Sequence, residues 1–194
     1  MHPAGEITSR RQQFLELLEA GVDAVRQAGT DTEIIMHFAG TADSGPFFDL
    51  IDDLDYDIIG ISYYPLFHGK DLAALQTVLE NLSQSFDKPV VIAEVAYPFT
   101  LQWNDFTHNL VGLEEQLILP DFPATPAGQR DFLQSIRSIV ADSIQNGIGI
   151  CYWGAELVAW KGPEATDASS WENQALFDFN NKALPVLDVF GDNE

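Results

Sequence analysis

Several side chains that can take part in chemistry stand at the ends of short apolar runs. Glu94 closes the run 90–93, where an ionised carboxylate is costly unless another group pairs with it or the protein uses it. Other runs end in residues that donate hydrogen bonds or stack on flat ligands: His37, Ser62, Tyr63, Tyr64, Tyr97, Tyr152 and Trp153. A sugar needs such a set, because its C–H face stacks on a ring while its hydroxyl groups form hydrogen bonds. The combination outlines a carbohydrate site.

Each of these residues also has a purely structural interpretation. A carboxylate such as Glu94 can be held by an arginine or by backbone amides, and an isolated histidine such as His37 is more often a hydrogen-bonded core residue. Trp153 and the Tyr63–Tyr64 pair are more often core residues than binding platforms. Their coincidence at the ends of several runs favours the functional interpretation.

The elements that position these residues follow from hydrophobic periodicity. Four runs without polar alternation predict strands buried on both faces, hence a parallel sheet: 33–38, 57–62, 89–94 and 148–153. Helical stripes cover 14–25, 72–82 and 132–144, and a shorter helix is expected over 47–55. Ser9 and Gln12 have the spacing of a capping box at the start of the first stripe. Asp71 is the expected N-cap of the second stripe, and Thr125–Pro126 supplies a cap and an N1 proline for the third. Because parallel strands gather their chemistry at their carboxyl ends, the residues above should converge.

The order of these elements predicts an α/β fold with right-handed crossovers in one domain, 1–194. A complete (β/α)8 barrel has eight strands and roughly 200 to 400 residues, so about four parallel strands with flanking helices make half of a barrel or a small open sheet. The stretch 97–126 is too long for a simple connection, and loops of that length in compact domains are usually functional.

Charge and composition exclude several classes of protein. The 194 residues include 30 acidic and 9 basic side chains, a net charge of −21 that repels nucleic acid and anionic membrane surfaces. A hydrophobic content of 46% excludes intrinsic disorder. Cys151 is the only cysteine, so it cannot form an intrachain disulfide, and we expect it to be a small buried residue. No run approaches the roughly 18 apolar residues of a membrane span, and no hydrophobic signal core stands near Met1.

Four motifs occur in a specific order: Ser62-Tyr63-Tyr64-Pro65 followed by His68-Gly69, then Glu94-Val95-Ala96-Tyr97-Pro98, then Tyr152-Trp153, then SSWENQALFD over 169–178. With 20–26 and 35–37, they make the chain resemble the C-terminal half of the family-53 glycoside hydrolases, the arabinogalactan endo-β-1,4-galactanases. The resemblance covers nearly the whole chain.

This resemblance implies the C-terminal half of a (β/α)8 TIM barrel that hydrolyses β-1,4-galactan with retention of configuration. Glu94 matches the nucleophile at the end of the seventh strand. Retention needs a second carboxyl about 5 to 5.5 Å away as acid and base. In the family that glutamate precedes the matched region, so we expect it upstream of Met1 and expect this chain to be an inactive or crippled fragment. Glu6 and Glu156 are the candidate substitutes within the chain.

The resemblance also assigns substrate-binding residues: His37, Tyr63, Tyr64, His68, Tyr97, Trp153 and Trp171. Trp171, with Glu172 and Asn173, either shapes the cleft or locks the closing helix of the barrel. The implied substrate is β-1,4-galactan or a galacto-oligosaccharide, and a polymer of that size implies an extracellular or periplasmic location. A dimer or the missing N-terminal half would cover the open sheet.

No cofactor is required. Some family members hold a structural calcium in loops of this kind, and the nearest string here is Asp105, Thr107, His108 and Asn109. It has one carboxylate, whereas calcium takes about six to eight oxygens, so the sequence favours a solvated loop and no metal. Two other classes stay open: a carbohydrate-binding half-barrel without catalysis, and an α/β scaffold for interactions.

Overall fold

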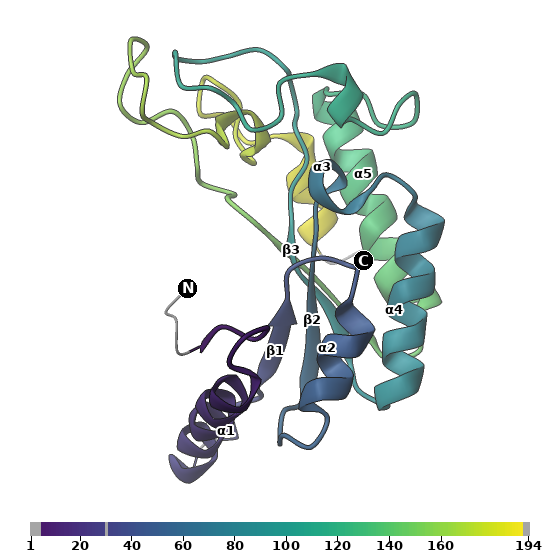
Figure 1. Ribbon diagram of the computed structural model, residues 1–194. Helices are drawn as coiled ribbons and strands as arrows, with labels where there is room; N and C mark the ends of the chain where they lie inside the picture. The colour runs from purple at the N-terminus through teal and green to yellow at the C-terminus, as the bar shows by residue number, and fades with distance from the viewer. Residues whose placement is uncertain (1–4, 30, 192–194) are drawn as a thin grey trace.

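The computed structural model describes residues 5–29 and 31–191 and contains one four-stranded parallel sheet (Figure 1). Its strands lie in chain order: β1 Ile35–Phe38, β2 Ile58–Tyr63, β3 Val90–Val95 and β4 Gly147–Tyr152. All four predicted strands are confirmed to within two residues at each end. Continuous runs of apolar residues are the strongest strand signal when a sheet is covered by other layers.

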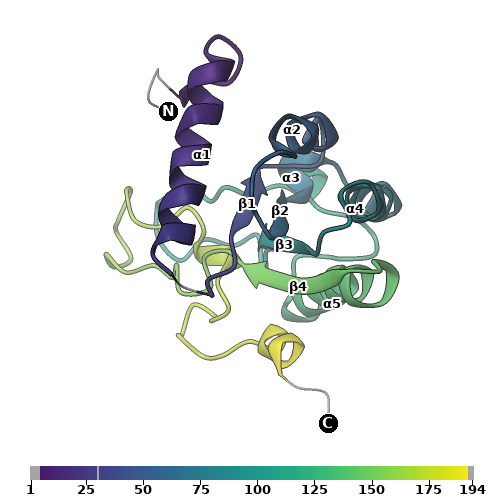
Figure 2. The same cartoon turned by 90° about the horizontal axis from the view of Figure 1, so that it is seen from below.

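The helices are α1 Arg11–Gln27, α2 Ser44–Ile51, α3 Pro65–His68, α4 Leu72–Phe86 and α5 Pro126–Ser138. A wide helical turn over Ile139–Ser143 continues α5, and short 3-10 segments cover Glu114–Gln116, Glu172–Gln174 and Pro185–Phe190. Seen from below, α2, α4 and α5 lie on one side of the sheet, while α1 stands beside β1 (Figure 2). None of the helices in the described ranges is long and apolar enough to cross a membrane.

Two of the three predicted caps are present. The capping box at Ser9 is wrong, because α1 begins after Arg10 without a side-chain cap and Ser9 Oγ donates to Glu6 Oε2 instead. The Asp71 carboxylate accepts hydrogen bonds from the backbone N–H groups of Ala73 and Ala74 at 2.9 and 3.1 Å. The Thr125 hydroxyl accepts one from Gly128 N–H at 3.0 Å, and Pro126 occupies the first turn of α5. Each cap satisfies backbone donors that the helix leaves free, which contributes about 1 kcal/mol.

The two faces of the sheet differ in their surroundings. On one face Ile59, Ile61 and Ile92 are fully buried together with residues of α4 and α5. On the other, Ile35 and Ile148 are 46% and 55% exposed, and Cys151 is exposed as well. The expectation that Cys151 is buried was therefore wrong, because its strand is covered from one side. The outer strands β1 and β4 each present an edge that no other strand of the described chain pairs with.

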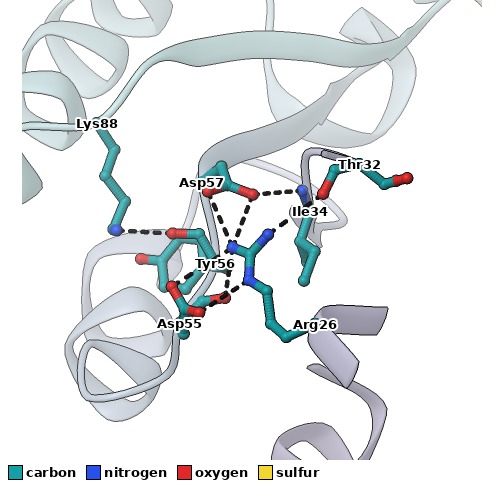
Figure 3. Close-up of polar contacts among 7 residues, drawn as sticks. All are labelled: Arg26, Thr32, Ile34, Asp55, Tyr56, Asp57 and Lys88. Atoms are coloured by element: carbon teal, nitrogen blue, oxygen red, sulfur yellow. Dashed lines mark hydrogen bonds and ion pairs between the residues drawn. The ribbon is translucent and has the colours of Figure 1, made fainter. Parts of the chain in front are cut away.

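An ionic network joins α1 to the amino ends of the strands (Figure 3). Arg26 Nε lies 2.8 Å from Asp55 Oδ2, and its Nη2 lies 2.9 Å from Asp57 Oδ2. Asp57 also accepts a hydrogen bond from Ile34 N–H at 2.7 Å, and this bond, with help from Arg26, lowers the pKa of Asp57. Lys88 Nζ donates to the Tyr56 carbonyl at 2.8 Å. Every charged group in this network has a partner.

Candidate active site

A β-bulge in β3 determines which way Glu94 points. Ile61 of β2 is in register with Ile92, but the next residue, Ser62, is in register with Glu94, so Ala93 is an extra residue. The register of β3 with β4 shifts over the same interval. In a regular strand Glu94 would share a face with Ile92, in the core. The bulge instead places Glu94 on the same side as Ser62 and turns Val95 into the core.

Three side chains form a hydrogen-bond network with Glu94. Ser62 Oγ and Tyr64 Oη each donate to Glu94 Oε2 at 3.0 Å. His37 Nε2, from β1, lies 2.7 Å from Ser62 Oγ. Burial raises the pKa of Tyr64, and the hydrogen bond to Glu94 raises it further, so this hydroxyl keeps its proton and remains a donor. Both donors use the same carboxylate oxygen, which leaves Oε1 without a hydrogen bond in the described chain.

His68 holds the turn that carries Tyr64. Its Nδ1 accepts a hydrogen bond from Tyr64 N–H at 3.0 Å, and burial lowers its pKa, which favours the neutral ring. Gly40, at φ 115°, packs so closely that a Cβ there would lie 2.9 Å from His68 Cδ2. His68, the last residue of α3, thus packs against Gly40 of the β1–α2 loop and holds the backbone of Tyr64.

Two indoles stand beside this network. The Trp171 ring lies 5.6 Å from the Tyr64 ring and 6.4 Å from the Trp153 ring. Trp153 follows β4, donates its backbone N–H to the Val95 carbonyl at 2.9 Å, and is 43% exposed. The structure therefore brings together Glu94, His37, Tyr64, Trp153 and Trp171, with His68 behind Tyr64.

Tyr63 and Tyr97 are corrections to the predicted set. Both are 1% exposed and stack on Phe132, with ring centroids 6.5 and 4.2 Å away. Their hydroxyls donate to the carbonyls of Gly69 and Phe122, at 2.8 and 2.6 Å. Tyr63 follows Ser62 in β2, and successive side chains of a strand point to opposite faces, so only one of the two can reach Glu94. We assign both phenols to the core.

The motif that contains Trp171 holds the long loop after β3. Asn173 Nδ2 donates to the carbonyls of Thr100 and Val111 at 2.8 and 2.7 Å, and Glu172 Oε1 accepts from Asn104 N–H at 2.7 Å. The Trp171 ring meanwhile lies against Tyr64. The indole thus lies beside Tyr64, and its neighbours Glu172 and Asn173 fasten the loop after β3 rather than a closing helix.

Gln129 of α5 is a residue that sequence reasoning missed. It is fully buried, and its Nε2 donates to the carbonyls of Tyr97 and Ala175 and to Tyr152 Oη, at 2.9, 3.1 and 3.2 Å. It joins the ends of β3 and β4 to the loop after Trp171. A glutamine on a helical stripe carries no signal that distinguishes this role from a solvated position.

In the loop that contains Asp105, Thr107, His108 and Asn109, the oxygens available to a cation differ from those that the sequence suggested. Asp105 Oδ2, Asn109 Oδ1 and Glu172 Oε2 are buried without a hydrogen-bond partner in the part of the chain that the structure describes. Burial raises the pKa of Glu172, and the nearby Asp105 carboxylate adds to the rise. Thr107 instead accepts a hydrogen bond from Ala168 N–H, and His108 packs edge-to-face against Trp103. Three oxygens, two of them from carboxylates, fit calcium in kind and make part of its shell.

No group of three or more His, Cys, Asp or Glu side chains in the ranges 5–29 and 31–191 is arranged to hold a metal ion. The two carboxylates and the amide oxygen of Asn109 supply three oxygen ligands. Because calcium takes about six to eight, it would also need backbone carbonyls or water.

The candidate substitutes for the second catalytic carboxyl, Glu6 and Glu156, make their hydrogen bonds within their own segments. Glu6 accepts hydrogen bonds from Ser9 and Thr8, which lower its pKa to about 2. A group that is ionised at neutral pH cannot donate a proton there, so Glu6 is unsuited to general acid catalysis. Glu156 is exposed in the turn after Trp153, where its carbonyl accepts from Val158 N–H. Neither joins the network around Glu94.

Comparisons with known proteins agree with this geometry. The profile of glycosyl hydrolase family 53 matches residues 1–190. An arabinogalactan endo-β-1,4-galactanase of Cellvibrio japonicus is 33% identical over 92% of this chain and 49% of its own length. An endo-β-1,4-galactanase of Bacillus subtilis is 28% identical over the same shares. The solved catalytic domain of the same family from Ignisphaera aggregans superposes with a TM-score of 0.89, at 32% identity, over 98% of this chain and 54% of that domain.

These matches, with the fold, place the chain among the barrel-type glycoside hydrolases. Within them it belongs to glycosyl hydrolase family 53. The chain spans about half the length of the curated relatives it matches. The prediction of half a (β/α)8 barrel is confirmed, because four parallel strands with their helices match about half of solved family barrels.

Proposed function

We propose that this chain carries the nucleophile of an endo-acting, retaining hydrolase of β-1,4-galactan. The observation that supports it most is the arrangement of Glu94: two hydroxyls hold Oε2 and leave Oε1 without a hydrogen bond in the described residues. The ring of Tyr64, one of these donors, lies beside Trp171, which in turn neighbours Trp153. Oxygen donors orient the carboxylate without neutralising it. The indoles offer the stacking surface that a galactosyl ring needs.

In the proposed reaction Glu94 Oε1 attacks the anomeric carbon and forms a glycosyl ester as the bond to the leaving oxygen breaks. The leaving oxygen takes the electron pair and a proton from a second carboxyl, about 5 to 5.5 Å from Glu94, which then activates water to hydrolyse the ester. The described residues contribute no second carboxyl to the network. We place it in the half-barrel, or the second copy, that would cover the open face of the sheet.

The role of the nucleophile can be tested without that of the general acid by using a substrate whose leaving group needs no proton. Dinitrophenolate is a stable anion that leaves without a proton, so a dinitrophenyl β-galactobioside needs only the nucleophile for the first step. We expect this chain to release dinitrophenolate, and mass spectrometry to find the galactobiosyl group on Glu94, while release of reducing ends from β-1,4-galactan stays slow.

Glu94→Gln is the matched control, because it keeps the shape of the side chain and removes its charge. Equal release by both proteins would refute the proposal for Glu94. Fast hydrolysis of galactan by the wild-type chain alone would show that a second carboxyl is supplied within it or by a second copy.

A second candidate function is a carbohydrate-binding half-barrel without catalysis. The exposure of Trp153 on the open face favours it, since binding needs the indoles and not a second carboxyl. Quenching of tryptophan fluorescence by galacto-oligosaccharide, unchanged in Glu94→Gln and without any dinitrophenolate release, would favour this function over the first. A chain serving only as an interaction scaffold would show no quenching.

We infer that calcium, where it binds, joins the loops after β3 and β4 through Asp105, Asn109 and Glu172, and that no step of the reaction depends on it. Millimolar calcium should then raise the Tm of the wild-type chain by a few degrees and leave that of Glu172→Gln unchanged. An equal response of both proteins, or none in the wild type, would contradict this.

The size of galactan also leads us to propose an extracellular or periplasmic location.

A further inference from the structure

Ser62 of β2 connects side chains of β1 and β3 at the carboxyl ends of the strands, because its hydroxyl contacts both His37 and Glu94. It is 2% exposed, it is the register partner of Glu94 across the bulge, and its hydroxyl contacts both Glu94 Oε2 and His37 Nε2. Because Ser62 is buried, it cannot contact a ligand directly, and any effect that it has on ligand binding must act through His37 and Glu94.

The hydrogens of this network have one consistent arrangement. An ionised carboxylate has no hydrogen, so both hydroxyls that contact Glu94 Oε2 must donate to it. The single hydrogen of Ser62 is thereby used. The 2.7 Å contact between Ser62 Oγ and His37 Nε2 then requires that Nε2 carries the hydrogen and donates it.

We propose that Ser62 is a positioning residue that fixes the tautomer of His37. With its hydrogen on Nε2, the neutral His37 ring has its lone pair on Nδ1, a hydrogen-bond acceptor on a side chain that is exposed on the open face of the sheet. Such an acceptor selects a ligand group that donates, namely a sugar hydroxyl. The inference rests on the proposed role of Glu94 only in requiring that Glu94 is ionised.

Tyr64 provides the natural comparison within the site. Its hydroxyl donates to the same oxygen of Glu94 at the same distance of 3.0 Å as Ser62, yet the hydrogen bond of His37 goes to Ser62 and not to Tyr64. Removal of the Tyr64 hydroxyl therefore weakens the hold on Glu94 without touching the tautomer of His37. Removal of the Ser62 hydroxyl does both.

The test is the nitrogen NMR spectrum of the imidazoles in the chain labelled with ¹⁵N-histidine. Spectra are recorded at about pH 8, above the ordinary histidine pKa of about 6.5, so that the rings are neutral. We expect His37, assigned through His37→Gln, to show a protonated Nε2 and an unprotonated Nδ1 in the wild type. Ser62→Ala should convert it to an averaged mixture of tautomers, Ser62→Thr should retain the wild-type pattern, and Tyr64→Phe should leave it unchanged.

His68 reports on folding in the same spectra. Its Nδ1 accepts from Tyr64 N–H, so it should show the protonated Nε2 form in every variant that is folded. Two results would overturn the proposal: a His37 pattern that is unchanged in Ser62→Ala, or one that changes as much in Tyr64→Phe. Because the spectra require neither sugar nor turnover, a fixed His37 with no galactosyl group on Glu94 would refute the proposed function and leave the role of Ser62 intact.

Discussion

The two ends of the sheet each hold carboxylates, in opposite ways. At the amino ends Asp55 and Asp57 are paired with the guanidinium of Arg26. At the carboxyl ends Glu94 is held by the neutral hydroxyls of Ser62 and Tyr64. A guanidinium neutralises a carboxylate and uses its oxygens, whereas hydroxyls orient it and leave its charge available. The two ends therefore differ in the partner of the carboxylate, a cation at one and neutral hydroxyls at the other, and the neutral partners fit the nucleophile proposed for Glu94.

The largest expected effect comes from a substitution at the carboxyl ends of the strands alone. Glu94→Gln should lower dinitrophenolate release from the activated galactobioside by about a thousandfold, because the amide is a very poor nucleophile. Its Tm should change little, since no ion pair is lost. A large drop in Tm would mean that Glu94 is a structural carboxylate like Asp57, and the contrast between the two ends would fail.

A second change probes the aromatic wall of the same end. Trp153→Ala should weaken binding of galacto-oligosaccharide about tenfold, the loss expected for a stacking ring worth about 1 kcal/mol or more beyond its buried area. Isothermal titration measures it. Trp160→Ala is the matched control, since Trp160 is a 70% exposed indole that contacts Lys161 rather than Tyr64 or Trp171. Equal losses in both would argue against a specific site at Trp153.

The converse experiment removes the ion pairs at the amino ends of the strands. Arg26→Ala leaves Asp55 and Asp57 without their cation and frees α1 from the start of β2, so we expect Tm to fall by several degrees. The dinitrophenolate release of the folded protein should stay at the wild-type rate. Thermal unfolding followed by circular dichroism, with the kinetic assay below Tm, checks both. A matching loss of turnover would show that the two ends are coupled.

The smallest effect is a pH dependence. The pKa of Asp57 is lower in the folded chain than in the unfolded one, so its contribution to stability is complete above the unfolded value of 3.8 and is lost as the pH falls through the lowered value. Asp57→Asn should therefore have a lower Tm than the wild type at about pH 6, and the two curves should converge on acidification. A constant difference at every pH would show that packing, not charge, accounts for the effect.

Sequence reasoning was accurate for elements and less so for the directions of side chains. Continuous apolar runs located all four strands, and Asp71 and Thr125 were recognised as caps because both signals are local. The face on which Tyr63 lies depends on the register with neighbouring strands, and the exposure of Cys151 depends on what covers the sheet. Asp105 and Glu172 lie near each other in the fold although they are 67 positions apart in the sequence, a separation that periodicity cannot span.

Because of the bulge at Ala93, we expect a deletion or insertion at this position to change the structure far more than a substitution would. A substitution at Ala93 alters one side chain, but deletion of Ala93 would exchange the environments of Glu94 and Val95, burying a charge among isoleucines and presenting an aliphatic group to the ligand. Loops elsewhere tolerate gain or loss of residues. In this interval the number of residues decides which side chain faces the candidate active site, so alignments and engineered variants must preserve it.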